Sequence, residues 1–164
     1  MKMRKLLVVL IIIVLAVSLL GCDPKEVSWT DSTSTRVHIV DWGLHPDTQT
    51  VTFNFGLNTI ELKDNGYTKL TFTLTFSALI DTGFFPSATV EAILKDDSMS
   101  TIGVGWNNLT YTNTTSRTYT YTKSVSIDKL LQEYGKLYLT FNAVKNTLQT
   151  GTYIGDIEIT VVAS

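Results

Sequence analysis

The chain has few side chains that could act as a general acid, a general base or a nucleophile. Its two histidines, His38 in a predicted strand and His45 in a predicted turn, do not have the spacing of a metal pair. The sequence also lacks a nucleophile elbow, a P-loop and a zinc-protease motif. Hydrolysis of a glycosidic bond would need two converging carboxylates. Four candidate carboxylates lie in or at the ends of predicted strands, namely Asp41, Glu61, Glu91 and Glu158. A hydrolase stays an alternative, and a protein without catalytic activity is our main expectation.

A structural calcium ion is the only cofactor that the sequence suggests. Asp96 and Asp97 are adjacent in the turn sequence KDDS. Calcium takes oxygen ligands from carboxylates and carbonyls, so this pair is a candidate cation site. The alternative is that two acidic residues in such a segment only shape the turn.

Aromatic and amide side chains gather between residues 106 and 121. In RTYTYTK, period-two alternation places Tyr119 and Tyr121 on one face of a strand, and Trp106 and Asn108 stand nearby in GVGWNNLTYT. Sugar rings stack their C–H faces on aromatic rings while their hydroxyls need directional polar partners. We therefore predict Trp106, Asn108, Tyr119 and Tyr121 as glycan-binding residues. The alternative is that the tyrosines pack in the core with their hydroxyls reaching water.

Cys22, the only cysteine in the chain, ends an apolar N-terminal segment. Three basic residues among the first five precede residues 6–20, which carry no charge, and Gly21 follows. The apolar run is shorter than the roughly 20 residues that a membrane-spanning helix needs. A basic start, a short apolar run and a small residue at its end are typical of an export signal. An uncleaved signal anchor is the alternative.

The sequence Leu19-Leu20-Gly21-Cys22 resembles the lipobox of bacterial lipoproteins. The resemblance implies diacylglyceryl transfer to the Cys22 sulfur, cleavage before Cys22, and N-acylation of the new terminus, commonly with palmitate. Two or more acyl chains hold a protein stably on a membrane, whereas one does so only marginally. We therefore expect residues 1–21 to be a signal peptide, and the mature protein to be lipid-anchored on the extracytoplasmic face of a cell membrane.

Cleavage would leave an acidic protein. Removing three of the 13 basic residues leaves ten against 15 acidic residues, a net charge of about −5. Nucleic acid binding needs a basic face, so nucleic acid is excluded as the expected partner. The membrane, reached through the lipid, and a glycan are the partners that we expect.

Residues 22–35 are expected to be the lipidated cysteine and a flexible tether. The segment DPKEVSWTDSTST is rich in polar residues and has too little apolar surface to fold alone, although Val27 and Trp29 are exceptions. The folded domain is then expected to span residues 36–164, a length that suits one domain with a real core.

Period-two alternation dominates the rest of the chain and predicts strands with one apolar and one polar face. The clearest segments are TVTFNFGL, KLTFTLTFSAL, KLYLTF and GDIEITVV. Further strands are expected at 36–42, 58–63, 88–95, 100–106 and 117–127. One helix is expected, with Asp128 as its cap, residues 129–134 as its body and Gly135 after its end. The sequence therefore predicts an all-β, antiparallel two-sheet sandwich of the jelly-roll kind.

The order of segments between residues 68 and 162 resembles the galactose-binding-like jelly roll found in many carbohydrate-binding modules. Those domains often close on a strand with an aromatic-aliphatic-Asp-Asp-aliphatic pattern, here Tyr153-Ile154-Gly155-Asp156-Ile157. The resemblance implies carbohydrate binding and a cation site that would include Asp156, although Gly155 replaces the first acidic residue. Our main hypothesis is a lipid-anchored, non-catalytic glycan-binding module. An envelope protein with a structural or protein-interaction role is the alternative besides a hydrolase.

Overall fold

The computed structural model describes residues 26–41, 47–82, 87–144 and 150–164. The predicted signal peptide, Cys22 and His45 lie outside these residues. Within the four ranges, no helix is both long and apolar enough to cross a membrane.

Most of the described chain is β-structure, as the alternation predicts. The strands are β1 (Val27–Thr33), β2 (Val37–Asp41), β3 (Thr48–Asn58), β4 (Lys69–Thr82), β5 (Ala88–Lys95), β6 (Thr101–Tyr111), β7 (Arg117–Ser126), β8 (Glu133–Val144) and β9 (Thr150–Ala163). Two short helical segments join them, α2 (Thr59–Asp64) and the single 3-10 turn η1 (Ile127–Lys129).

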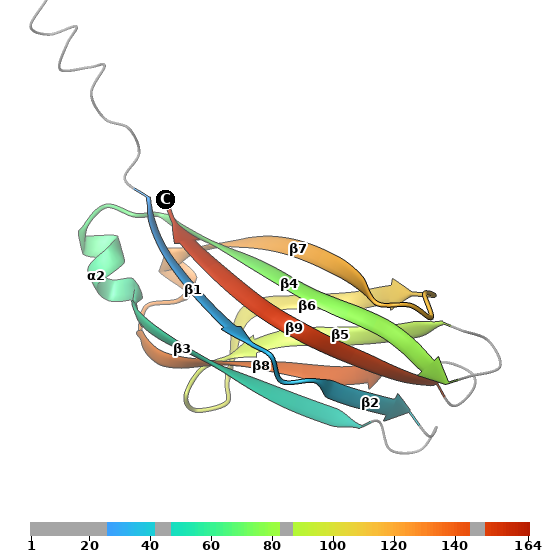
Figure 1. Ribbon diagram of the computed structural model, residues 1–164. Helices are drawn as coiled ribbons and strands as arrows, with labels where there is room; N and C mark the ends of the chain where they lie inside the picture. Colours follow the sequence, from blue (N-terminus) through green and yellow to red (C-terminus); the bar gives the residue numbers. More distant parts are fainter. Residues whose placement is uncertain (1–25, 42–46, 83–86, 145–149) are drawn as a thin grey trace, which may run out of the picture.

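The strands form two antiparallel sheets packed face to face (Figure 1). The first sheet has the order β1-β9-β4-β7, with β2 also paired to β9, and the second has the order β3-β8-β5-β6. Strands that are consecutive in sequence often lie in opposite sheets, as in β3 and β4 or β6 and β7. This exchange between two sheets is the jelly-roll arrangement, so the predicted fold class is confirmed.

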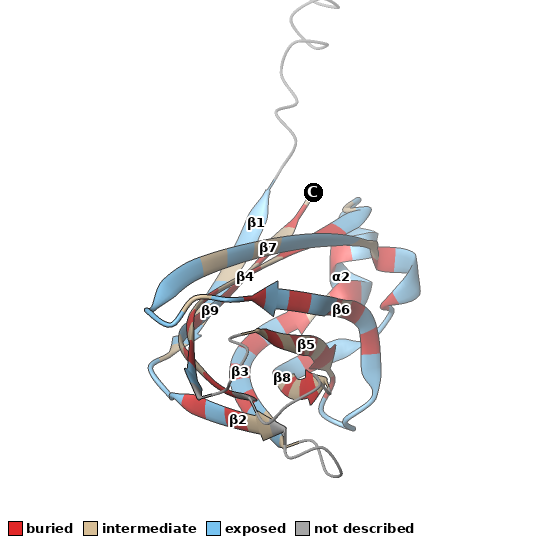
Figure 2. Cartoon of the chain, turned by 90° about the vertical axis from the view of Figure 1, so that its right-hand side faces the viewer, coloured by how far each residue is buried: buried red, intermediate tan, exposed pale blue. Residues whose placement is uncertain are grey.

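The core lies between the sheets, where the inner faces of the strands meet (Figure 2). In β4, Phe72, Leu74 and Phe76 are fully buried, while the threonines between them stay partly exposed on the outer face. The ring of Phe76 contacts Phe141 of β8, in the second sheet, edge-on, with ring centroids 5.9 Å apart. Alternation of apolar and polar residues therefore decides which face of each strand is buried.

The expected tether over residues 22–35 is wrong from Val27 onward, because β1 is the edge strand of the first sheet. Residues 27–33 pair with residues 157–163 of β9 in one continuous register. The indole of Trp29 packs against the core, and the Asp31 carboxylate accepts the backbone N–H of Asn54 at 2.7 Å, which links β1 to β3. A polar segment thus becomes a strand because β9 supplies its backbone partners.

Two predictions about short segments, a strand at 58–63 and a helix at 129–134, are also wrong. The strand expected at 58–63 is the helix α2, whose N-cap Asn58 accepts the backbone N–H of Glu61 at 3.0 Å. The helix expected at 129–134 is instead η1 followed by the start of β8, where Tyr134 is buried opposite Leu57 of β3. Strand pairing and burial of the Tyr134 ring outweigh a weak local helix signal.

Hydrogen exchange tests whether residues 27–33 belong to the folded domain. We expect peptides that cover β1 to exchange much more slowly than an unstructured chain, because pairing with β9 holds alternate amides in hydrogen bonds. The intact chain is exchanged for set times and then digested, and mass spectrometry gives the deuterium uptake of each peptide. Residues 34–36, which connect β1 to β2, provide an internal comparison. Exchange of β1 at the rate of a free peptide would restore the longer tether.

Candidate functional site

The predicted aromatic residues of β7 lie on its inner face, at the open side of the sandwich between β6 and β7. Tyr119 and Tyr121 are partly buried, and their rings lie nearly parallel with centroids 6.5 Å apart. Both contact Phe76, and Tyr119 also contacts Tyr111. The Tyr119 hydroxyl donates a hydrogen bond to the side-chain oxygen of Asn113. Both rings therefore continue the core, as in the alternative that the sequence left open.

Trp106 and Asn108 do not join these tyrosines in one exposed surface. Trp106 is only 7% exposed and belongs to the core. Asn107 and Asn108 together oppose the single residue Glu91 of β5, a β-bulge in which Asn108 adopts a φ of 55°. Asn108 is consequently exposed while Trp106, two residues earlier, is buried.

Burial also governs the ionisation of the tyrosines. It raises the pKa of Tyr111 to about 12, and it raises the pKa of Tyr121. These phenols stay neutral over the physiological range, so they act as packing and hydrogen-bonding groups. Lys123 closes the same opening, since its ammonium donates to the backbone carbonyl of Gly105 at 2.7 Å.

The carboxylates of Asp96 and Asp97 both accept hydrogen bonds in and around the β5–β6 turn. One oxygen of Asp96 accepts the Ser98 hydroxyl at 2.7 Å and the backbone N–H groups of Ser98 and Ser100, both at 2.9 Å. Its other oxygen accepts the Gln132 amide at 3.0 Å, and Asp97 accepts the backbone N–H of Lys136. These contacts are those of a structural turn.

The other candidate ligands and carboxylates do not converge either. Among the described residues, no group of three or more His, Cys, Asp or Glu side chains could hold a metal ion. Glu61 lies on α2, while Glu91 and Glu158 lie on strands of opposite sheets. The side chain of Asp41 lies outside the described part. The Nε2 atom of His38 lies 2.8 Å from the Asp81 carboxylate, and the His38 ring stacks on Tyr153.

A polar hollow lies elsewhere, on the outer face of the first sheet. Strand β9 pairs with β2 up to Ile154 and with β1 from Ile157 onward, so Gly155 and Asp156 have no strand beside them on that side. On the other side, the register with β4 shifts between Thr75 and Ser77, and Asp156 takes a φ of 49°. This bulge turns the Asp156 side chain to the outer face.

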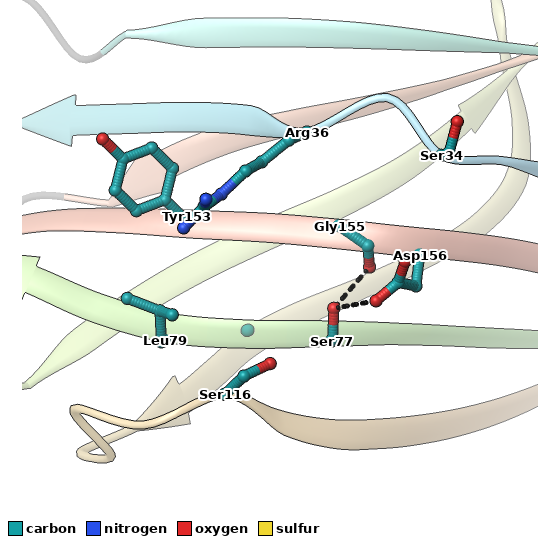
Figure 3. Close-up of a pocket in the computed structure, with 9 residues that line it drawn as sticks. Ser34, Arg36, Ser77, Leu79, Ser116, Tyr153, Gly155 and Asp156 are labelled. Carbon is teal, nitrogen blue, oxygen red and sulfur yellow. Dashed lines mark hydrogen bonds between the residues drawn. The ribbon is translucent and has the colours of Figure 1, made fainter.

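The hollow has a volume of about 350 Å³ and runs from the β1–β2 connection across β9 and β4 (Figure 3). Its polar lining consists of Ser34, Arg36, Ser77, Ser116, Tyr153 and Asp156. The Ser77 hydroxyl contacts the Gly155 carbonyl oxygen at 3.0 Å and the Asp156 carboxylate at 2.8 Å. Because this hydroxyl has one proton, the two acceptors share it, and the second Asp156 oxygen stays open to another donor.

Arg36 supplies the positive charge of the hollow. Its guanidinium carbon lies 3.9 Å from the centroid of the Tyr153 ring, a cation–π contact that fixes the side chain over the sheet (Figure 3). In the part of the chain that the structure describes, no carboxylate forms an ion pair with this guanidinium. The lining of the hollow therefore includes a guanidinium, a carboxylate and serine hydroxyls, with the guanidinium lying beside Tyr153 and the carboxylate beside Ser77 (Figure 3).

Of the predicted site residues, only Asp156 lies in this hollow. Arg36 and Ser77 were not predicted, and Tyr153 was named only as part of the motif at residues 153–157. The bulge nevertheless has a signal in the sequence. Ile154 and Ile157 are both fully buried but stand three residues apart, which breaks the period-two pattern. An interval of three between inward residues therefore marks both this bulge and the one between Trp106 and Leu109.

A larger hollow, of about 830 Å³, lies at the end of the β6–β7 opening that is away from Tyr119. It is bounded by the β5–β6 turn, η1 and the end of β7. Asp96 and Gln132 there are already paired with each other, and Lys129, Leu131 and Met99 around it are exposed. The side chains of Asp96, Ser98 and Ser100 in its lining are likewise hydrogen-bonded within the turn.

The chain matches no family model and no curated protein. Among solved structures it is similar to that of the infectious bursal disease virus Gt strain, with a TM-score of 0.58, 12% identity, and coverage of 87% of this chain. It spans only 36% of that viral chain. At this identity the likeness concerns the fold alone, and it agrees with the jelly-roll topology.

Two carbohydrate-binding modules match at lower TM-scores. One is a CBM4 module, with a TM-score of 0.42, 16% identity, and coverage of 71% of this chain and 61% of that one. The other is CBM27-1 of Caldicellulosiruptor saccharolyticus in complex with mannohexaose, with a TM-score of 0.40, 14% identity, and coverage of 68% and 65%. With TM-scores below 0.5, neither match carries a conclusion about this chain.

The turn at Asp96 gives a test by pH. The hydrogen bond from the Ser98 hydroxyl, with further bonds from Ser100 and Gln132, lowers the pKa of Asp96 below its ordinary value of 3.8. A lowered folded-state pKa stabilises the protein above pH 3.8, and this stabilisation is lost as the pH falls through the folded-state value.

We expect Asp96→Asn to lower the free energy of unfolding by roughly 1–2 kcal/mol at pH 7, because charge-assisted hydrogen bonds are stronger than neutral ones. The difference from the wild type should shrink as the pH falls below 3.8. Urea unfolding at several pH values gives the measurement, with Asp64→Asn, an exposed carboxylate on α2, as the matched control. A difference that stays constant with pH would contradict the turn's dependence on the ionised carboxylate.

Proposed function

We propose that this protein is a lipid-anchored, non-catalytic β-sandwich module that binds a hydroxyl-rich ligand of the glycan type in the hollow at Arg36. The carrying observation is the convergence of the Arg36 guanidinium, the Asp156 carboxylate and the serine hydroxyls on one volume. Sugar hydroxyls can donate a hydrogen bond to a carboxylate and accept one from a guanidinium. Both charged groups could therefore bind hydroxyls of the same sugar ligand.

Backbone geometry supports the assignment of the hollow as a binding site. Asp156 is one of three non-glycine residues with a positive φ in the described ranges, the others being Met99 and Asn108. Such a conformation costs free energy and persists only where its surroundings enforce it. In Asp156 it orients a carboxylate toward the hollow and is held by the contact with Ser77.

Preorganisation favours ligand binding at this position. Ser77 positions Asp156 from β4, and the Tyr153 ring positions Arg36 from β9. Because both charged groups are held before the ligand arrives, less side-chain entropy is lost on binding.

The membrane part of the proposal rests on the lipobox at residues 19–22. It is supported by the basic residues and the uncharged run before it, and by the position of the only cysteine at its end. A short connection to Val27 then holds the domain close to the bilayer, because β1 starts five residues after Cys22.

Glycan binding is tested with the detergent-solubilised full chain on a glycan array, followed by titration of the best ligand. Arg36→Ala should weaken binding by about 10- to 100-fold, since a hydrogen bond to a charged group contributes about 1.5–3 kcal/mol. Arg117→Ala is the matched control, because Arg117 is exposed but does not line the hollow.

Two outcomes would contradict this assignment. No retention on any glycan would oppose the proposed ligand class. Binding that survives Arg36→Ala but is lost in Tyr121→Ala would move the binding site to the β6–β7 opening.

Lipid attachment is tested by Cys22→Ser in a bacterial host. We expect the wild-type chain to incorporate a clickable palmitate analogue and to fractionate with membranes, and Cys22→Ser to lose the label. Leu20→Ala is the control, since it keeps the lipobox and should keep the label. Equal labelling of Cys22→Ser and the wild type would contradict acylation at this sulfur.

A further inference from the structure

The described residues leave four large apolar side chains exposed, and all four lie at one end of the sandwich. They are Val27, Ile60, Met99 and Leu131, with exposed fractions of 38%, 48%, 45% and 47%. Isolated exposed apolar residues are ordinary, so what singles out these four is that the segments carrying them lie at the same end. We call this group the apolar end.

Direct contacts connect the segments that carry these residues. The backbone N–H of Thr59 donates to the carbonyl of Gln132 at 3.1 Å, which places Ile60 beside the segment of Leu131. Gln132 also donates to Asp96, whose backbone carbonyl accepts the N–H of Met99 at 2.9 Å.

The fourth residue, Val27, lies on the other side of α2. It lines a small hollow together with Trp29, Tyr67 and the α2 residues Glu61 and Leu62. Figure 1 shows α2, the start of β1 and the C-terminus at the same end of the molecule.

The position of Cys22 selects the bilayer as the occupant of this surface. Val27 is the fifth residue after Cys22, so the connection reaches at most roughly 17 Å even when fully extended. The strands β4 and β9 have 14 residues each, and strands of this length run for roughly 46 Å. A lipid on Cys22 would therefore keep the Val27 end near the membrane and the opposite end away from it.

The nearby aromatic residues fit the same occupant. Trp29 and Tyr67 are partly buried beside Val27 and pack against the core. Trp and Tyr are favoured at the level of lipid headgroups, because one part of each ring system is apolar and the other is polar.

The charged residues at this end carry both signs. Glu61, Lys63 and Asp64 lie on α2, and Lys63 forms an ion pair with Asp128 at 2.6 Å. Lys129 follows in η1. With opposite charges mixed in this way, no basic patch attracts anionic lipid, so contact with a bilayer depends on apolar burial.

We propose that the apolar end rests on the bilayer surface, with Ile60, Met99 and Leu131 in the headgroup region and the hollow at Arg36 on the flank of the molecule. This orientation rests on the proposed lipid anchor at Cys22. Shallow burial of three or four side chains adds to the anchor without replacing it, since full burial of one such side chain contributes about 1.5–3 kcal/mol.

The test uses the lipidated full chain in phosphatidylcholine vesicles. Leu131→Cys and Ile60→Cys each introduce a thiol for an environment-sensitive fluorophore, because the acylated Cys22 sulfur does not react. Thr114→Cys is the matched control. Thr114 is exposed in the connection between β6 and β7, at the opposite end of β6 from the β5–β6 turn.

Nitroxide-labelled lipids should quench the fluorophore at Leu131 and Ile60 several-fold more strongly than at Thr114. Quenching should persist at high salt, because the contact is apolar rather than electrostatic. Unchanged thermal melting of each variant ensures that the exposed substitutions leave the fold intact.

Two results would overturn the proposal, and they differ in what else they affect. Equal quenching at all three positions in a protein whose mass shows the acyl groups would refute the orientation and leave the anchor standing. A mass without acyl groups, with Cys22→Ser fractionating like the wild type, would refute both the anchor and the orientation.

Discussion

Pairing along β9 is the constraint on which the first sheet depends. This strand pairs with β4 on one side and with β1 and then β2 on the other. Its inward residues Ile154, Ile157, Ile159 and Val161 are fully buried, so displacing β9 would expose the core and separate its three partner strands. The strand is not regular throughout. On the side where β2 and then β1 pair with it, Gly155 and Asp156 lie between the two partners and pair with neither.

This irregularity of β9 is also where polar chemistry gathers. The bulge at Asp156 brings a carboxylate to the outer face, the gap between β1 and β2 places Arg36 above Tyr153, and Ser77 of β4 holds the carboxylate. The remaining outer face of this sheet is a layer of hydroxyls that satisfy one another across strands, as in Thr73 with Thr122. A fold held by apolar burial thus places its binding groups where the regular ladder is interrupted.

Several expectations from the sequence were correct because they depend on local periodicity. The alternation around Phe72 and Leu74 predicts the strand, its buried face and the sandwich class, since strand side chains alternate wherever the strand pairs. The predictions for 58–63, 129–134 and the tether were wrong for the opposite reason. Those segments have weak local preferences, and contacts with residues far away in sequence, such as Trp29 with the core and Tyr134 opposite Leu57, decide their conformation.

The sequence by itself determined an all-β sandwich with threonine-rich outer faces, together with an N-terminal pattern that predicts export and lipid attachment. It also contained the bulges, as apolar residues three positions apart. Only the tertiary structure decided that Tyr119, Tyr121 and Trp106 pack inward, and that Arg36, Ser77 and Asp156 meet. The physical reason is that alternation assigns each residue to a face, but only strand order and register bring residues as distant in sequence as Ser77 and Asp156 within 2.8 Å of each other.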